Sequence, residues 1–192
     1  MDREAENKPQ TRPCKTARLF SRFRRDGRGN VAIEFGVLAL PFALLVFAIL
    51  ESSISFAAQQ LMSSATDDVA RQIRTGQIKL ADLEKDPDLV MNRICDRLEI
   101  VASSCRSELE VDLKSYETFA QAAAQRIPIK AGDLDTSGFI VKPGKSGDKN
   151  QLRVFYRWPV MTDFMRKSMS TLNGGKTLHF ATVTWQNEPF DD

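Results

Sequence analysis

The chain has 192 residues, enough for one modest domain with appendages, because domains commonly contain about 100–150 residues. Its formal net charge of +2 conceals an asymmetry. Residues 1–29 contain nine basic and four acidic side chains, whereas residues 30–192 contain 18 basic and 21 acidic ones. A basic arm can bind nucleic acid. This one directly abuts an apolar segment, which favours a role in membrane topology and argues against a nucleic-acid partner.

The apolar segment Phe35–Leu50 is 16 residues long and contains no charged side chain. As a helix it would be about 24 Å long. A spanning helix needs about 20 mainly apolar residues, which the segment reaches once its flanks are included. The alternative is a buried helix of a soluble protein, but such a helix usually has a polar stripe, and this segment has none. The sequence therefore predicts a transmembrane helix over residues 30–58.

Two carboxylates and a proline stand out in this helix. Glu34 lies just inside its beginning, where a carboxylate is unfavourable unless it has a partner or lies near the lipid headgroups. Glu51 follows directly after the apolar segment, at the expected membrane exit. Pro41 lies inside it, and proline is tolerated more often in membrane helices than in soluble ones.

The basic arm predicts the orientation, because Lys and Arg hold the adjacent helix end in the cytoplasm. We expect a cytoplasmic arm at residues 1–29, the membrane helix at 30–58, and an extracytoplasmic domain at 59–192. A cleaved signal peptide is the alternative, since Ser55-Phe56-Ala57 offers a small-x-small cleavage site. Against it, the apolar core is longer than the usual 7–15 or so residues.

The first half of the extracytoplasmic domain has helical patterns. Apolar residues recur every fourth position after the membrane segment at Leu61, Ala65, Val69 and Ile73. The helix is therefore expected to continue to about Thr75, with Gly76 as its C-cap. Asp86-Pro87 is the expected start of a second helix, and Ser115–Gln125 is the expected third.

The second half is rich in strand patterns. Apolar residues alternate with polar ones around Leu109–Leu113 and Leu152–Trp158, and Thr177–Gln186 is also rich in strand-forming residues. The stretch Lys142–Asn150 has the composition of a loop. These patterns predict an α+β domain in which short helices accompany a roughly three-stranded antiparallel sheet.

Three segments in chain order resemble the TadE-like family, the minor pseudopilins of the tight-adherence (Flp-type) pilus assembly system. The first runs from Phe23 through Phe35 into Leu40-Pro41 and Glu51. The second is Ala70–Gln77, and the third is Thr184–Phe190. The resemblance implies a pilin-like fold, in which one long N-terminal helix packs on a small sheet.

The resemblance also implies proteolytic processing. Prepilin-like precursors are cut after a glycine by a membrane prepilin peptidase, and a glutamate stands fifth in the product. Cleavage after Gly29 makes Asn30 the first residue and Glu34 the fifth, whereas Gly27 fails this test. Glycine lets a protease approach the backbone closely, and the glutamate can pair with a new α-amino group in lipid. The alternative is that Glu34 simply lies at headgroup level and that both glycines are loop residues.

Two of the three cysteines lie on the predicted periplasmic side, Cys95 and Cys105, while Cys14 lies in the arm. Because the bacterial periplasm oxidises thiols, the pair is a candidate disulfide that stabilises the fold by about 3 kcal/mol. Two buried free thiols are the alternative.

No catalytic, metal or cofactor site is expected. The single histidine, His179, lies in a strand-like segment, and the acids are scattered as if on solvated faces. Asp135–Phe139 is faintly similar to the metal-binding signature of von Willebrand type A domains, but Phe139 replaces its second serine. A zinc site would need more ligands than one histidine and a cysteine pair.

We therefore expect a minor pseudopilin-like pilus assembly protein, not an enzyme, in a bacterial inner membrane. Its expected partners are the membrane, a prepilin peptidase, other pilin or pseudopilin subunits and inner-membrane pilus assembly proteins. One alternative is an uncleaved signal-anchored periplasmic interaction protein without a filament role. Another is a secreted enzyme released after Ala57.

Overall fold

A computed structural model describes residues 30–189 of the chain. It divides the chain into two compact units, Met1–Val46 and Phe47–Asp192, and each is described by itself below. One helix, α2 (Asn30–Arg74), has residues in both units and is 45 residues long. Among the described residues, it is the one helix long and apolar enough to cross a membrane.

The described part of the first unit is the N-terminal portion of α2. Its apolar side chains are exposed on every side of the helix, and Val31, Phe35 and Leu38 are each more than 70% exposed. Pro41 lies within the helix, as the sequence predicts for a membrane segment. No residue described in this unit is buried, so the surface of the helix has the character that lipid or other helices would cover.

In the second unit, α2 has one buried face. Its buried apolar side chains are spaced by three or four residues: Ala58, Met62, Ala65, Val69 and Ile73. This spacing places them on a single stripe that packs into the core. The helix ends at Arg74, and Gly76 follows with a positive φ of 72°. The predicted C-cap is therefore confirmed.

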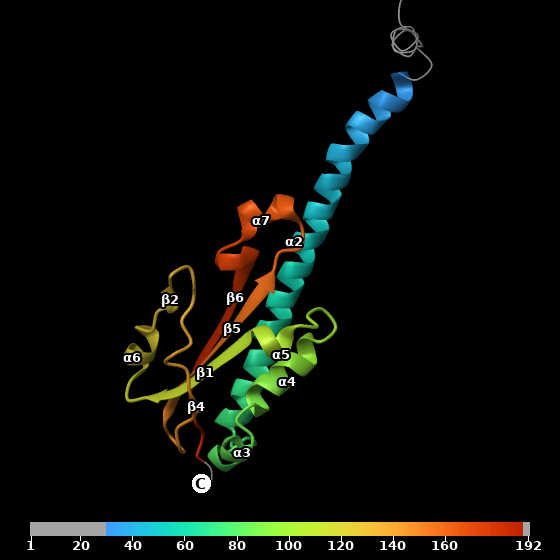
Figure 1. Ribbon diagram of the computed structural model, residues 1–192. Helices are drawn as coiled ribbons and strands as arrows, with labels where there is room; N and C mark the ends of the chain where they lie inside the picture. Colours follow the sequence, from blue (N-terminus) through green and yellow to red (C-terminus); the bar gives the residue numbers. More distant parts are fainter. Residues whose placement is uncertain (1–29, 190–192) are drawn as a thin grey trace, which may run out of the picture. The chain divides into compact units, whose positions relative to one another are not determined.

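The sheet of the second unit has four strands in the order β4-β1-β5-β6 (Figure 1). The three long strands, β1 (Leu109–Tyr116), β5 (Lys149–Pro159) and β6 (Lys176–Gln186), pair antiparallel as predicted. The expected count of three is wrong, because β4 (Val141–Lys142) adds a parallel edge strand to β1. A two-residue strand is too short to show alternation, and it lies at the start of the predicted loop.

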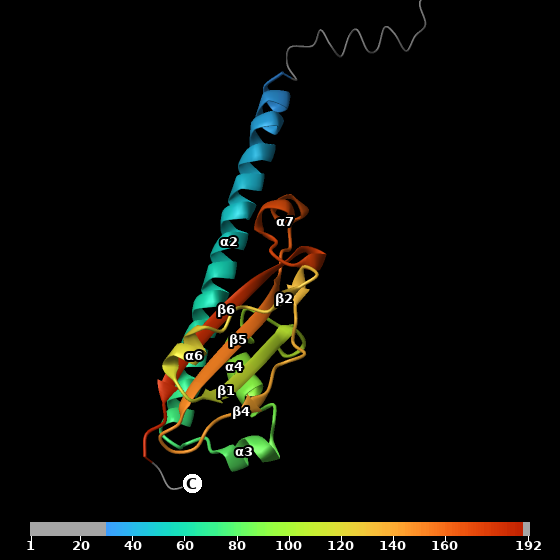
Figure 2. The ribbon, with the colours of Figure 1, turned by 90° about the vertical axis from the view of Figure 1, so that its left-hand side faces the viewer.

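Short helices connect these elements (Figure 2). They are α3 (Leu80–Lys85), α4 (Leu89–Leu98), α5 (Cys105–Glu108), α6 (Phe119–Ala123) and α7 (Asp163–Met169). A short 3-10 helix, η2 (Asn173–Gly175), and a separate hairpin of β2 (Ile129–Lys130) and β3 (Asp133–Leu134) complete the fold.

Two predicted helix boundaries are wrong. Helix α4 begins at Leu89 rather than at Pro87, because the Asp86 carboxylate accepts the Asp88 N–H at 3.1 Å and forms a turn before the helix. The predicted helix over Ser115–Gln125 is reduced to α6, since its first two residues belong to β1. The Thr118 hydroxyl caps α6 by accepting the Gln121 N–H at 3.2 Å.

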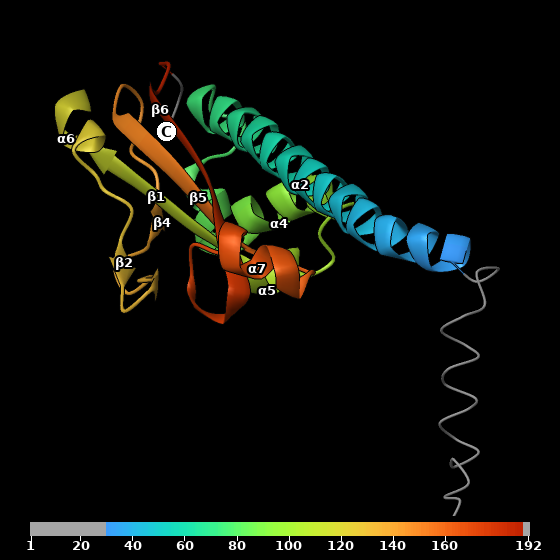
Figure 3. The same cartoon turned by 90° about the horizontal axis from the view of Figure 1, so that it is seen from above.

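Both faces of the sheet are covered, as Figure 3 shows for α2 and α4 on one side and α6 and β2 on the other. The alternate residues of β5 that the sequence predicts to be apolar, Leu152, Val154, Tyr156 and Trp158, join the main core with α2 and α4. On the opposite face Gln151, Arg153 and Phe155 are also buried.

The helix also lies along the β6 edge of the sheet. The side-chain amide of Gln59 donates to the Phe180 carbonyl at 2.9 Å and accepts the Phe180 N–H at 3.2 Å. One side chain of α2 thus satisfies both backbone groups of an edge-strand residue.

Candidate functional site

The predicted processing site lies at the beginning of α2. Asn30 is the first residue of the helix, while Gly29 and the basic arm lie outside the described residues. Glu34 is exposed, in the second turn of the helix. Its neighbours in the chain, Ile33 and Phe35, are 59% and 72% exposed, so its carboxylate lies within an apolar surface.

This position suits the chemistry that pilin-like processing requires. Residues four apart lie on the same face of a helix, so the Glu34 side chain and the backbone nitrogen of Asn30 share one face. The helix begins at Asn30, so Glu34 lies about one turn from the helix N-terminus. Cleavage before Asn30 would add a full positive charge to that end. Helix α2 begins at Asn30, the residue that would follow the cut, whereas the cleavage itself stays a prediction.

Glu51, at the other end of the apolar segment, is buried in the second unit and is 8% exposed. Its carboxylate accepts the Met161 N–H at 2.5 Å, the Thr162 N–H at 3.3 Å, and the Thr162 hydroxyl. The sequence marks Glu51 as the residue at the membrane exit but gives no sign of these partners, since they lie 110 residues or more away in the chain. Glu51 therefore attaches the segment after β5 to helix α2.

His179 is a buried core residue, as the strand-like pattern around it indicates. Its Nε2 lies 2.9 Å from the Ser55 hydroxyl, and its ring stacks on Trp158 with centroids 5.3 Å apart. Burial lowers its pKa to about 4, so the imidazole is neutral at pH 7. Its Nδ1 has no hydrogen-bond partner among the described residues. No carboxylate orients the ring, so the Ser55–His179 pair lacks the third group of a hydrolytic triad.

Asp112 contradicts the expectation that the acids lie on solvated faces, because it is 1% exposed. It forms a buried ion pair with Arg153, whose Nε lies 3.1 Å from the carboxylate. Its other oxygen accepts the Ile140 N–H at 3.1 Å. The Arg153 guanidinium also lies near the rings of Phe139 and Phe155, at 5.9 and 5.7 Å. The pair holds the segment before β4 onto the sheet, which is a structural role.

Cys95 and Cys105 form a disulfide between α4 and α5, with their Cα atoms 5.5 Å apart. Both residues are almost fully buried. This is the pairing that the periplasmic topology favours over two free thiols. No group of three or more His, Cys, Asp and Glu residues that could hold a metal ion occurs within residues 30–189.

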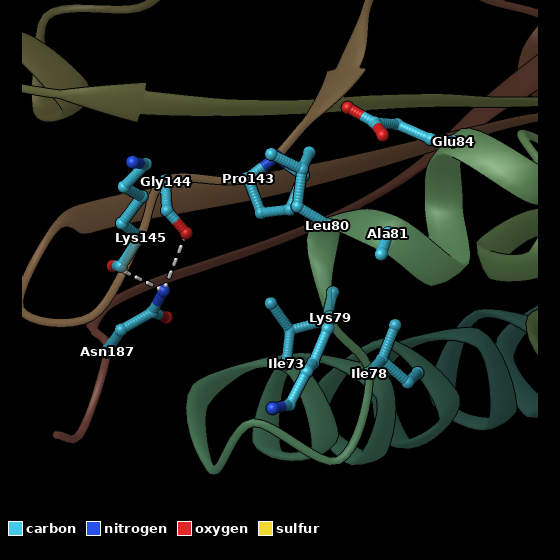
Figure 4. Close-up of a pocket in the computed structure, with 10 residues that line it drawn as sticks. All are labelled: Ile73, Ile78, Lys79, Leu80, Ala81, Glu84, Pro143, Gly144, Lys145 and Asn187. Carbon is cyan, nitrogen blue, oxygen red and sulfur yellow. Dashed lines mark hydrogen bonds between the residues drawn. The ribbon is translucent and has the colours of Figure 1, made fainter. Parts of the chain in front are cut away.

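A pocket of about 240 Å³ lies where the end of α2, α3 and the β4–β5 loop meet (Figure 4). Its apolar wall includes Ile73, Ile78 and Leu80, and charged side chains at Lys79, Glu84 and Lys145 also line it. None of its lining residues is a serine, cysteine or histidine, so the pocket contains no Ser–His or Cys–His pair.

The second and third segments of the family resemblance meet beside this pocket. Asn187 donates from its amide to the Gly144 and Lys145 carbonyls, both at 2.9 Å, and accepts from the Trp185 indole at 2.8 Å. The next residue, Glu188, donates its N–H to the Arg74 carbonyl at 3.0 Å and pairs with the Arg74 guanidinium at 3.2 Å. These residues fasten the C-terminal segment to the end of α2, which gives the sequence pattern a structural reason.

A family model for TadE-like proteins matches residues 29–71. No curated protein and no solved structure matches the chain. The matched segment begins at Gly29, contains Glu34 and Glu51, and ends three residues before the end of α2. The predicted resemblance is therefore confirmed for residues 29–71, over which the chain is similar to TadE-like proteins.

Proposed function

We propose that this protein is a minor pseudopilin of a Tad (Flp-type) pilus assembly apparatus. The apolar part of α2 anchors it in the bacterial inner membrane, with the basic arm in the cytoplasm and the second unit in the periplasm. The observation that carries the proposal is the position of Glu34 near the start of an exposed apolar helix, five residues after Gly29 in the sequence and inside the TadE-like match.

Prepilin peptidase cuts between Gly29 and Asn30 and releases the basic arm. The new α-amino group of Asn30 then lies one helical turn from Glu34, or meets the Glu34 of a neighbouring subunit. In lipid an unpaired carboxylate is unfavourable, so this pairing favours insertion of the processed helix among other pilin helices. The exposed apolar side chains along residues 31–46 supply the packing surface.

The second unit supports the periplasmic location. It contains a buried disulfide, and disulfides persist in oxidising compartments such as the periplasm. The buried carboxylate and imidazole groups of this unit serve its packing, so its contribution to the apparatus is that of a folded binding surface.

Processing is tested by coexpressing the full-length protein with a prepilin peptidase and measuring the mass of the product. We expect loss of residues 1–29 and a new N-terminus at Asn30. Gly29→Val blocks the cut, because valine hinders close approach of the protease to the backbone. Gly27→Val is the matched control, two residues earlier, and leaves cleavage intact. An uncut product with wild-type sequence refutes the processing step.

The role of Glu34 is tested separately. Glu34→Leu leaves cleavage and membrane insertion intact and reduces piliation, because the pairing with the α-amino group is lost. Glu117→Leu makes the same chemical change at an exposed residue of the second unit and leaves piliation unchanged. Normal piliation in the Glu34→Leu strain refutes the pairing role.

The second candidate function is an uncleaved signal-anchored periplasmic interaction protein, favoured by the basic residues before the apolar segment, which orient a permanent anchor as well as a leader. It predicts a full-length product that stays in the inner membrane when pili are sheared from the cells. Release after Ala57 is disfavoured by the structure, because Ala58 is fully buried in the core and α2 continues through this site without interruption.

A further inference from the structure

The connection between β5 and β6 is the part of the second unit that lies nearest to the expected membrane exit. Contacts along α2 establish the order: Ser55 bonds His179, Gln59 bonds Phe180, and Arg74 bonds Glu188. Strand β6 therefore follows α2 in the same direction. Residues 160–175, which precede β6, lie at the beginning of the helix portion in this unit, and Figures 1 and 2 both show α7 beside α2 there.

The depth of this connection follows from Glu51. Leu50 is the last residue of the apolar segment, and Glu51 is one residue, or about 1.5 Å, further along the helix. The headgroup layer on each side of a bilayer is about 5–8 Å thick. Because Glu51 accepts the backbone N–H groups of Met161 and Thr162, it holds these residues at headgroup level when residues 31–50 span the bilayer.

Three side chains exposed at this level suit a lipid surface. Met161 is 71% exposed. Arg166 and Lys167 are both exposed on α7. Arg166 pairs with Asp163 at 2.8 Å, whereas Lys167 has no ion pair among the described residues. Asp163 is the one acidic residue of α7, so the helix keeps a net positive charge. An exposed apolar residue followed by basic side chains suits phospholipid headgroups.

We propose that Met161, Arg166 and Lys167, here called the membrane-exit surface, rest on the headgroups of anionic phospholipid. Met161 enters the boundary between headgroups and acyl chains, and the two cations contact lipid phosphates. Glu51 supplies the rigid link that holds this surface at the correct depth. The inference rests on the proposed membrane insertion of α2 and adds a second, peripheral contact with the same bilayer.

The test places a fluorescent probe on the full-length protein in vesicles of mixed phosphatidylglycerol and phosphatidylcholine that contain nitroxide-labelled lipid. A Cys14→Ser background leaves the disulfide as the remaining cysteine pair, and single cysteines are introduced at Met161, Leu44 or Ser146. Ser146 lies beside Glu188, which bonds Arg74, about 36 Å beyond Leu50 along the helix.

We expect strong quenching of the Met161→Cys probe by headgroup nitroxides, quenching of Leu44→Cys by acyl-chain nitroxides, and none of Ser146→Cys. In the Met161→Cys protein, Lys167→Gln lowers the ratio of molecules with the membrane-exit surface bound to lipid to molecules with it free by roughly fivefold. One basic residue near an anionic membrane contributes about that factor. Vesicles of phosphatidylcholine alone abolish the effect of Lys167→Gln.

The outcomes separate the inference from the proposed function. If Leu44→Cys is quenched and Met161→Cys is quenched no more than Ser146→Cys, the anchor stands and the membrane-exit surface is refuted. If Leu44→Cys is not quenched by acyl-chain labels, the membrane insertion of α2 is refuted, and the inference with it. Quenching of Met161→Cys that is insensitive to Lys167→Gln refutes the electrostatic part.

Discussion

The two portions of α2 belong to one continuous helix yet have opposite surroundings. In residues 31–46 apolar side chains occur on every side and all are exposed to some degree. Residues 47–74 instead bury a single stripe, while their other faces carry polar groups together with exposed apolar residues such as Phe47 and Phe56. Hydrophobicity alone therefore does not determine packing. The stripe, with apolar residues spaced by three or four, is what docks a helix on its own domain. The uniform surface is left for lipid or for other helices.

A charged side chain in the buried stripe of α2 should lower the stability of the second unit more than any other change considered below. Met62 is fully buried, so Met62→Asp places a carboxylate in the core without a partner. We expect a loss of more than about 4 kcal/mol in the free energy of unfolding of the second unit. This loss is measured by unfolding the detergent-solubilised full-length protein in urea and monitoring the folded fraction by its resistance to protease.

The same charge in the exposed portion is the matched control. Leu45 is 57% exposed, so Leu45→Asp should leave the urea midpoint of the second unit unchanged. Membrane insertion should instead weaken by about 2.5–3.5 kcal/mol, which extraction with alkaline carbonate detects. Equal losses of protease resistance in the two variants would contradict the division of the helix.

Removal of the disulfide should destabilise the second unit by a smaller amount. The bond closes a loop with a sequence separation of 10, for which the loop-entropy relation gives about 3 kcal/mol. We expect Cys95→Ala combined with Cys105→Ala to lower the urea midpoint accordingly without affecting membrane insertion. Cys14→Ala, which leaves the bond intact, serves as the control, and an unchanged midpoint in the double variant would show that the bond contributes nothing.

Acid should destabilise the second unit through His179. The folded pKa of about 4 lies below the unfolded value near 6.5, so the unfolded state binds the proton first as the pH falls. The contribution of the neutral His179 imidazole to the free energy of unfolding is fully present above about pH 6.5. It is lost progressively as the pH falls to about 4. Between pH 7 and pH 5 the loss should be about 2 kcal/mol.

The His179 contribution is isolated by comparing unfolding free energies at the two pH values in the wild type and in His179→Gln. The variant is less stable at pH 7 but should lose less on acidification. A pH dependence that is identical in both proteins would assign the effect to other groups.

The smallest effect is expected at Glu51, in the first two turns of α2 in the second unit. Glu51→Gln keeps one acceptor and loses the charge, so hydrogen bonds to Met161 and Thr162 weaken, and stability should fall by about 1–2 kcal/mol. Hydrogen exchange of these two amides should accelerate, while exchange in β5 stays slow. Glu84→Gln changes an exposed glutamate in the same way and should leave both quantities unaffected.

The sequence predicts the long elements well because their patterns extend over many residues. Helix α2 ends within one residue of the predicted Thr75, and the three long strands lie where alternation predicts them. Pairs such as β1–β4 depend on a two-residue strand, which has no period to detect. Helix α7 is likewise missed, since its seven residues follow no clear apolar spacing.

The candidate site divides in the same way. The assignment of Gly29 and Glu34 comes from the family resemblance and from their spacing in one local segment of chain, and it stays a prediction. Glu51 and Asp112 gain their roles from residues far away in sequence, Thr162 and Arg153, and no local pattern indicates such partners. The buried faces of β5 illustrate the same limit, since Arg153 looks solvated in sequence and is 6% exposed in the fold.

The hydrogen bonds between Gln59 and Phe180 have a consequence for self-association. Strand β6 is an 11-residue edge strand, and long open edges recruit strands from other molecules into mixed sheets. The N–H and carbonyl groups of Phe180 already bond the side-chain amide of Gln59. They are therefore not available to pair with an incoming strand. Helix α2 therefore blocks the addition of a further strand at this point of the β6 edge.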